Sequence, residues 1–119
     1  MLLLPETRDT RLFIGKEELG AMQGAFLLNA GRGSAVDTAA LLEALRAGNV
    51  RGAGLDVTDP EPLPAGHPLW SMQNVVITPH YGGVHPGYEE EAFSVFLENL
   101  GRWVRGEPLE HVVDRDAEY

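Results

Sequence analysis

The chain has 119 residues, of which 44% are hydrophobic and 23% are charged, and this length and composition suit one soluble globular domain. Its formal net charge of −9 and its scattered Lys and Arg residues argue against nucleic acid or an anionic membrane as a partner. It contains no cysteine, which excludes disulfides, thiolate nucleophiles and cysteine-ligated metal centres. No apolar run approaches the roughly 20 residues that cross a bilayer, so we expect a cytoplasmic protein.

The first half of the chain alternates strand-like and helix-like segments. Short apolar runs bounded by turn residues predict strands. Asp37 is a good N-cap for a helix, and Gly48 is a good residue to end it. The elements expected here, in order, are a strand at 2–4, a helix at 16–22, a strand at 25–29 and a helix from 37 to about 47.

The second half begins with two more strand-like runs, at 52–57 and 74–78, which a proline-rich loop separates. A long helix is expected at about 86–105, because acidic residues at its start and basic residues at its end both favour the helix dipole. Its apolar residues form one stripe, which we expect to be a packing face. The stripe comprises Phe93, Phe96, Leu97, Leu100, Trp103 and Val104.

This alternation predicts an α/β fold with a parallel sheet of about four strands and a long C-terminal helix. A doubly wound nucleotide-binding domain opens with a strand, a G-x-G-x-x-G turn and a helix that bind a pyrophosphate. The sequence lacks that pattern, and Gly31 and Gly33 on either side of Arg32 do not supply it. We therefore expect the second half of a Rossmann-like sheet, with residues 1–106 as a partial NAD(P)-binding domain and 107–119 as a tail.

Three polar residues each follow one of the expected strands. Arg32 lies in a glycine-flanked turn, Glu61 lies in the proline-rich loop, and His80 lies just beyond the last strand. The carboxyl ends of parallel strands meet at one edge of a sheet, where open α/β folds bind their ligands. The three side chains are therefore expected to meet in one site.

Each of these positions also has a structural interpretation when it is taken alone. Arg32 could be a solvated surface arginine, and Glu61 could be an ordinary polar loop residue. Asp56, which ends a strand, could simply cap the turn that follows it. Only the order and spacing of the polar residues favour a site over these alternatives.

A metal site is a further alternative. His80 and His85 lie near the acidic residues 89–91, but Pro86 interrupts the spacing and the sequence has no H-E-x-x-H pattern. We therefore expect no metal.

Six short motifs occur in order along the chain and carry a resemblance to a known family. They are LPETR at 4–8, LLNAGRG at 27–33, GLDV at 54–57, EPLP at 61–64, HPLW at 67–70 and NVVITPH at 74–80. In order and spacing they resemble the C-terminal part of D-isomer-specific 2-hydroxyacid dehydrogenases, in particular the glyoxylate and hydroxypyruvate reductase branch. The family's first βαβ half and its substrate domain have no counterpart in this sequence.

The resemblance implies that Arg32, Glu61 and His80 are the catalytic residues. Imidazole gains and loses a proton near neutral pH, which suits His80 as the acid–base group when a carbonyl becomes an alcohol. Glu61 would accept a hydrogen bond from the other ring nitrogen and so orient the imidazole. The planar guanidinium of Arg32 would bind the carboxylate of a 2-oxo acid through two hydrogen bonds.

The resemblance also implies NAD or NADP as the cofactor, without distinguishing between them. Asp56 would bind the nicotinamide carboxamide, and glycines would let the backbone approach the flat ring. The cofactor-binding residues that the resemblance implies are Ala30, Gly31, Arg32, Asp56, His80, Gly82 and Gly83.

The leading hypothesis is therefore an NAD(P)-dependent oxidoreductase that reduces a small 2-oxo acid such as glyoxylate or hydroxypyruvate, present here as a truncated or split portion. The alternative is a non-catalytic remnant that acts as an oligomerising structural module. A bare sheet edge and an uncovered helix face would favour self-association, so we expect a homo-oligomer or a separate chain that carries the N-terminal half.

Overall fold

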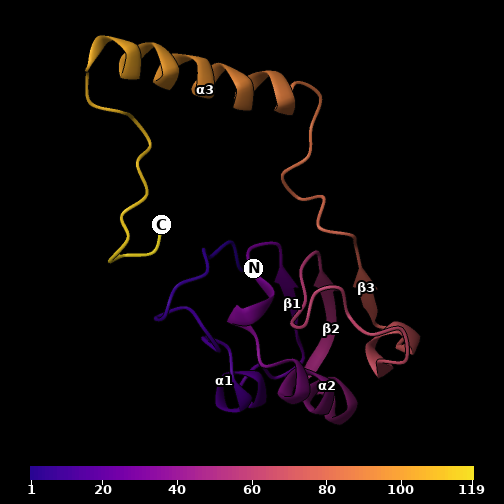
Figure 1. Cartoon of the computed structure of the whole chain (residues 1–119). Helices are drawn as coiled ribbons and strands as arrows, with labels where there is room; N and C mark the ends of the chain where they lie inside the picture. Colours follow the sequence, from indigo (N-terminus) through magenta and orange to yellow (C-terminus); the bar gives the residue numbers. More distant parts are fainter.

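The computed structural model describes the whole chain, residues 1–119, and consists of a body, residues 1–83, and an arm, residues 84–119, that carries a long helix (Figure 1). None of its helices combines the length and apolar character that a membrane span requires. The elements, in order, are α1 (Lys16–Gly20), β1 (Ala25–Asn29), a 3₁₀ turn (Gly33–Ala35), α2 (Thr38–Ala47), β2 (Val50–Leu55), a 3₁₀ turn (Pro68–Ser71), β3 (Val75–Ile77) and α3 (Tyr88–Arg105).

The sheet is parallel, as expected, but it has three strands in the order β1-β2-β3 rather than about four. The segment expected as a further strand at 2–4 forms only an isolated bridge beside β1. Leu2 donates to the Leu28 carbonyl oxygen (2.8 Å) and accepts from the Ala30 amide (3.1 Å). No further residue of the segment 2–4 pairs with β1.

Helix α2 has both of the predicted ends. The Asp37 carboxylate accepts a hydrogen bond from the Ala40 amide at 2.9 Å, which satisfies a free donor in the first turn. Gly48 ends the helix in the left-handed conformation, with φ at +79°. Helix α1 ends at Gly20, two residues earlier than expected, because glycine is a weak helix former.

The proline-rich loop contains a short 3₁₀ turn, Pro68–Ser71, that the sequence did not predict. His67 lies just before it and accepts a hydrogen bond from the Leu69 amide through Nδ1, at 3.3 Å. Leu69 is 1% exposed and packs into the core, so the turn fastens this loop to the body.

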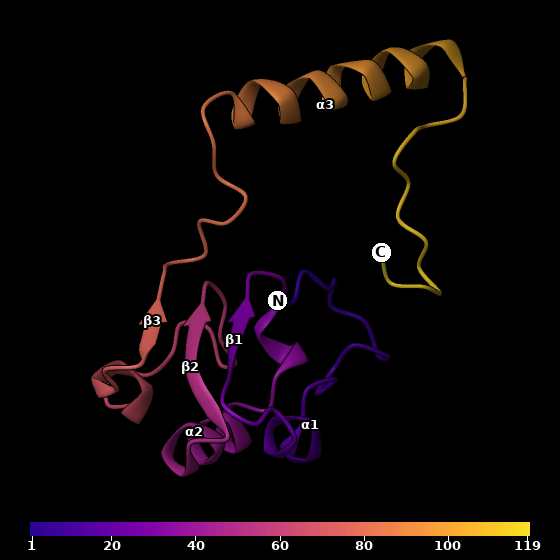
Figure 2. The ribbon, with the colours of Figure 1, turned by 180° about the vertical axis from the view of Figure 1, so that it is seen from behind.

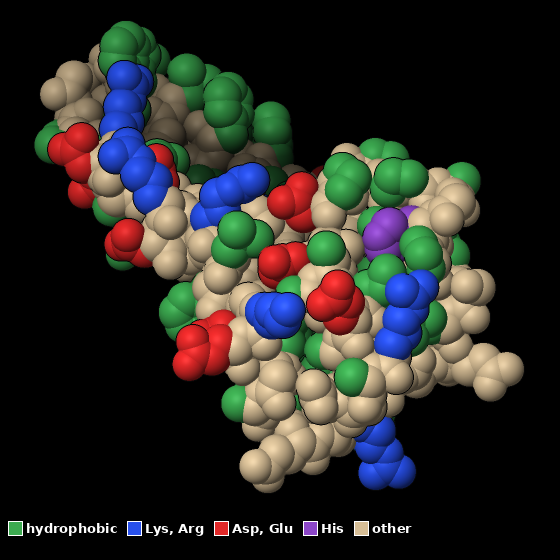
Figure 3. Space-filling view, turned by 90° about the horizontal axis from the view of Figure 1, so that it is seen from below, with side chains coloured by type: hydrophobic (Ala, Val, Ile, Leu, Met, Phe, Trp, Pro, Cys, Tyr) green, Lys and Arg blue, Asp and Glu red, His purple; other side chains and the backbone are tan.

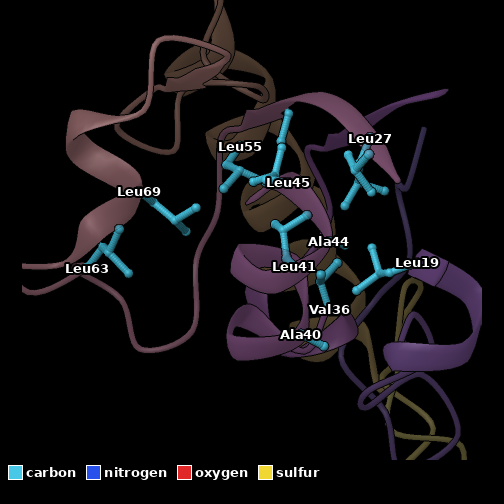
Figure 4. Packing of buried hydrophobic residues seen from close by; sticks show 12 residues of the cluster. Leu19, Leu27, Val36, Ala40, Leu41, Ala44, Leu45, Leu55, Leu63 and Leu69 are labelled. Carbon is cyan, nitrogen blue, oxygen red and sulfur yellow. The ribbon is translucent and has the colours of Figure 1, made fainter. Parts of the chain in front are cut away.

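The core lies between one face of the sheet and helices α1 and α2 (Figure 4). Helix α2 supplies its apolar face, and Leu63 and Leu69 approach from the proline-rich segment. The core cluster is Leu19, Leu27, Val36, Ala40, Leu41, Ala44, Leu45, Val50, Ala53, Leu55, Leu63 and Leu69.

The opposite face of the sheet is uncovered. Phe26 is 64% exposed and Val76 is 65% exposed, and Leu28 lies beside them on this face. Gly52 and Gly54 leave room there, because an added Cβ would lie 2.9 Å from the Phe26 ring and 2.7 Å from the Leu28 side chain, respectively. Doubly wound sheets have a layer of helices on each face, whereas this sheet has helices on one face only.

Helix α3 lies apart from the body and contains no buried residue (Figure 2). The expectation that its apolar stripe is a packing face is therefore not met within this chain. Hydrophobic side chains are visible along the protruding arm in the space-filling view (Figure 3), and Trp103 is 72% exposed. An amphipathic pattern shows which face of a helix is apolar but not what covers it.

The tail beyond α3 turns back toward the body (Figures 1 and 2). Glu118 accepts hydrogen bonds from the Arg8 amide at 2.7 Å and from Arg8 Nε at 3.0 Å. Apart from this exposed contact between its two ends, the chain holds the arm out from the body.

Candidate active site

The predicted site residues lie at the carboxyl end of the sheet, where the three strands point the same way (Figure 2). Arg32 follows β1, Asp56 follows β2, and His80 lies three residues beyond the end of β3. The loops after three neighbouring strands therefore bring these side chains to one rim, as the parallel pairing requires.

His80 and Glu61 form a close pair. The distance between His80 Nδ1 and Glu61 Oε1 is 2.7 Å, and the two side chains are 45% and 41% exposed. An ionised carboxylate can only accept a hydrogen bond, so Nδ1 carries the proton in this pair and Nε2 is the nitrogen left for a ligand. The geometry suits proton exchange at Nε2, and the roles of the two residues stay predictions.

Arg32 and His80 line the same cavity, which has a volume of about 420 Å³. The exposed Arg32 side chain donates from Nη1 to the neighbouring Gly31 carbonyl oxygen at 2.9 Å, which leaves its other donors for a ligand. Most of the predicted cofactor-binding residues line this cavity, whereas Gly31 is buried beside it. The predicted residues that line the cavity are Ala30, Arg32, Asp56, His80, Gly82 and Gly83.

Glu61 lies on a second cavity of about 400 Å³, which also touches His80. Leu63, Trp70 and Ile77 give this second cavity an apolar wall. The His80 imidazole therefore lies between a cavity that contains the Arg32 cation and a cavity with apolar walls.

Asp56 holds the loop that carries His80. Its Oδ1 accepts from the Tyr81 amide at 2.9 Å and from the Thr78 hydroxyl, and its Oδ2 accepts from the Gly82 amide at 2.7 Å. The Thr78 hydrogen bond is the main cause that lowers the pKa of Asp56, and the two amides and nearby His80 also lower it, against the opposing effect of desolvation. Asp56 therefore stays ionised, with one of its roughly four acceptor positions free.

The glycines beside Arg32 are required by contacts within the protein. A Cβ at Gly31 would lie 2.6 Å from the Leu4 carbonyl oxygen, and a Cβ at Gly33 would lie 1.9 Å from the Thr58 carbonyl oxygen. Both distances are too short for a side chain, so close approach of protein backbone explains these two residues. The expected approach of these glycines to a nicotinamide ring stays a prediction.

Sequence reasoning missed two residues that organise the site, Asn29 and Thr78. Asn29 is 2% exposed, and its side chain donates to the Arg32 carbonyl oxygen at 2.9 Å and accepts from the Gly31 amide at 3.1 Å. An asparagine that ends a strand just before a glycine turn is a known signal for such local bonds. The bond from Thr78 to Asp56 depends on tertiary pairing of β2 and β3 and has no local signal.

No three His, Cys, Asp or Glu side chains lie together in a way that could hold a metal ion. The two histidines of the metal-site alternative lie in separate pairs. His80 pairs with Glu61, and His85 Nε2 lies 3.8 Å from Glu91 Oε2.

Comparison with known proteins identifies the family. Residues 1–82 match the family model described as the NAD-binding domain of D-isomer specific 2-hydroxyacid dehydrogenases. The chain is 51% identical over 100 residues to glyoxylate/hydroxypyruvate reductase B of Enterobacter sp. (strain 638), an alignment that covers 83% of this chain and 31% of the relative. It is 41% identical over 114 residues to the enzyme of the same name from Pectobacterium carotovorum, which covers 95% of this chain and 36% of the relative.

Solved structures give the same result. A D-isomer specific 2-hydroxyacid dehydrogenase from Xanthobacter autotrophicus Py2, crystallised with NADPH and MES, matches 98% of this chain with a TM-score of 0.89 and 42% identity. An NADPH-dependent glyoxylate/hydroxypyruvate reductase from Sinorhizobium meliloti matches 98% with a TM-score of 0.88 and 36% identity. The chain spans 48% and 38% of those two structures, respectively. The fold is therefore part of a Rossmann-like NAD-binding domain, and the chain belongs to the D-isomer specific 2-hydroxyacid dehydrogenase family.

Proposed function

We propose that this chain supplies the catalytic and nicotinamide-facing part of an NAD(P)-dependent oxidoreductase that reduces a small 2-oxo acid such as glyoxylate or hydroxypyruvate. The observation that carries the proposal is the arrangement around His80. Its imidazole is 2.7 Å from Glu61 and shares a cavity of about 420 Å³ with Arg32. A cation for a carboxylate and an oriented proton donor for a carbonyl are therefore present on one rim.

Each side chain has one task in the proposed reaction. Arg32 binds the substrate carboxylate and places the adjacent carbonyl oxygen near His80. A reduced nicotinamide held beside Ala30, Gly82 and Gly83 would supply the hydride that the carbonyl carbon accepts. His80 donates its Nε2 proton to the carbonyl oxygen, and Glu61 stabilises the doubly protonated imidazole before that transfer.

The residues of the rim fit the nicotinamide end of the cofactor. Ala30, Gly82 and Gly83 give the cavity small walls, and the fourth acceptor position of Asp56 suits a carboxamide N–H donor. The phosphate end has no such site in this chain, because the sequence contains no G-x-G-x-x-G turn. NAD and NADP therefore stay equally supported.

The pyrophosphate site would have to come from elsewhere. The chain spans only 31% to 48% of the length of the relatives described above. We propose that it works as part of a longer polypeptide, with a separately encoded N-terminal half, or as a homo-oligomer. The uncovered sheet face and the exposed stripe of α3 support such a partner. The cytoplasmic location expected from the sequence stays a prediction.

A titration with NADH tests the proposal, both for this chain by itself and for the chain together with an N-terminal half that carries the pyrophosphate site. The enzyme hypothesis requires saturable binding and glyoxylate-dependent oxidation of NADH, and His80→Ala should reduce that rate by about 100-fold to 10,000-fold. His111→Ala, on the tail, is the matched control and should keep the full rate. Equal activity in the two variants would remove His80 from the mechanism.

A non-catalytic oligomerising module is the second candidate, and one observation favours it. Helix α3 has an 18-residue amphipathic surface with no buried residue, which is a surface suited to association. This candidate requires an oligomer in light scattering and no saturable NADH binding. The hypothesis that the chain is an enzyme by itself requires saturable binding of NADH.

A further inference from the structure

A single carboxylate, that of Asp56, accepts hydrogen bonds from residues on both sides of His80 in its loop. Asp56 accepts hydrogen bonds from Thr78, two residues before His80, and from Tyr81 and Gly82, the two residues after it. The three bonds therefore hold the loop on both sides of the histidine. No other side chain contacts the loop through hydrogen bonds on both sides of His80.

The backbone of His80 requires this support. Its φ angle is +59°, in the left-handed region that residues other than glycine adopt rarely. The His80 side chain is 45% exposed, so surrounding packing does little to hold it. Its position depends on the loop geometry and on the bond from Nδ1 to Glu61.

We propose that Asp56 is the positioning residue for His80: by holding Thr78, Tyr81 and Gly82, it fixes the left-handed turn that places Nδ1 against Glu61 and leaves Nε2 for a ligand. Asp56 would act on the imidazole through the backbone, across the ends of β2 and β3. The proposal rests on the proposed function for its catalytic meaning only, because the geometry that it explains exists without cofactor or substrate.

The chemistry of the contacts explains why a carboxylate is needed. All three partners of Asp56 are donors, and an ionised carboxylate is an acceptor at both oxygens. An asparagine would present its NH₂ group to at least one of these donors and lose that bond. A Cβ at position 82 would lie 2.9 Å from Asp56 Oδ2, so a larger residue there would displace this carboxylate.

Proton and nitrogen NMR of the histidine side chains tests the proposal on the whole chain. The Nδ1 proton of His80 should give a downfield resonance in the unaltered protein, because it donates to a carboxylate, and Glu61→Gln should shift it and so identify it. Asp56→Ala should abolish this resonance. Thr78→Val, which removes only the hydroxyl donor, should move it upfield, and Thr78→Ser should restore it.

The controls separate positioning from loss of fold. Asp37→Ala removes a carboxylate that caps α2 and should leave the His80 resonance unchanged. Amide signals of core residues such as Leu41 and Val50 should be retained in every variant, and if Asp56→Ala does not fold, the Thr78 pair decides. An unchanged His80 resonance in the folded Asp56→Ala or Thr78→Val protein would overturn the proposal. The readout needs no cofactor, so failure of NADH binding would contradict the proposed function without affecting this result.

Discussion

The body and the arm of this chain are built on different principles. All of the 19 buried residues lie between Leu19 and Leu69, within the sheet, the helices α1 and α2 and the loops that join them. The arm, residues 84–119, has none. Tertiary packing stabilises the body. Helix α3 is stabilised only by hydrogen bonds within the helix and to its tail, and the stability of an isolated helix in water is marginal. The site belongs to the body, since its groups lie on the ends of packed strands.

Truncation of one leucine in each region should give the largest contrast. Leu41 in α2 is 1% exposed, and Leu97 in α3 is 49% exposed. Leu41→Ala should lower the free energy of unfolding of the body by about 2–5 kcal/mol, through lost burial and a cavity. Leu97→Ala should change it by less than about 0.5 kcal/mol. Urea denaturation followed by circular dichroism measures both, and comparable losses would show that α3 is packed in solution.

Two glycines of the body test how tightly the Arg32 turn is packed. Gly33→Ala places a Cβ 1.9 Å from the Thr58 carbonyl oxygen, and this overpacking should cost about 1–3 kcal/mol of unfolding free energy. Gly66→Ala is the matched control, because nothing lies within 4 Å of its added Cβ, and it should be within about 0.5 kcal/mol of the unaltered protein. Equal denaturation midpoints would show that the turn can move away from Thr58.

Acid should release the His80 loop only at a pH below the ordinary pKa of an aspartate. The pKa of Asp56 is below its ordinary value of 3.8 in the folded chain, so its ionised form is the one that folding favours. This contribution to stability is complete above the unfolded pKa and is lost as the pH falls through the folded pKa. The Tyr81 and Gly82 amide resonances should therefore titrate with a midpoint below 3.8, and a midpoint above that value would contradict the hydrogen bonding.

The contact between the ends of the chain should have the smallest energetic effect. The Arg8 and Glu118 side chains are 83% and 33% exposed, and exposed ion pairs contribute about 0–1 kcal/mol. Glu118→Gln should leave the unfolding free energy of the body unchanged but let the tail move away. Small-angle scattering should then report a radius of gyration above that of the unaltered chain, whose Cα value is 18.1 Å in the structure. An unchanged radius would mean that other contacts hold the tail.

The sequence was sufficient to predict those features of the structure that local signals determine. Asp37 and Gly48 predicted both ends of α2, because caps act over a few residues. The meeting of Arg32 and His80 on one cavity followed from parallel strands alone. The shortening of the strand expected at 2–4 to a bridge at Leu2 and the contact of Gly33 with Thr58 could not be predicted, because each depends on segments distant in sequence. The uncovered face of α3 was expected, but only from the family resemblance and not from the local pattern.

The polar groups of the rim lie outside the core that gives the body its stability. Arg32, Glu61 and His80 are exposed, and Trp70, beside His80, is 51% exposed. Substitution of these exposed side chains should cost little free energy of folding, so the chemistry of the rim can change while the scaffold keeps its stability. Gly31 and Gly33 belong both to the rim and to the packed body, and they are the positions of the Arg32 turn where evolutionary change should be slowest.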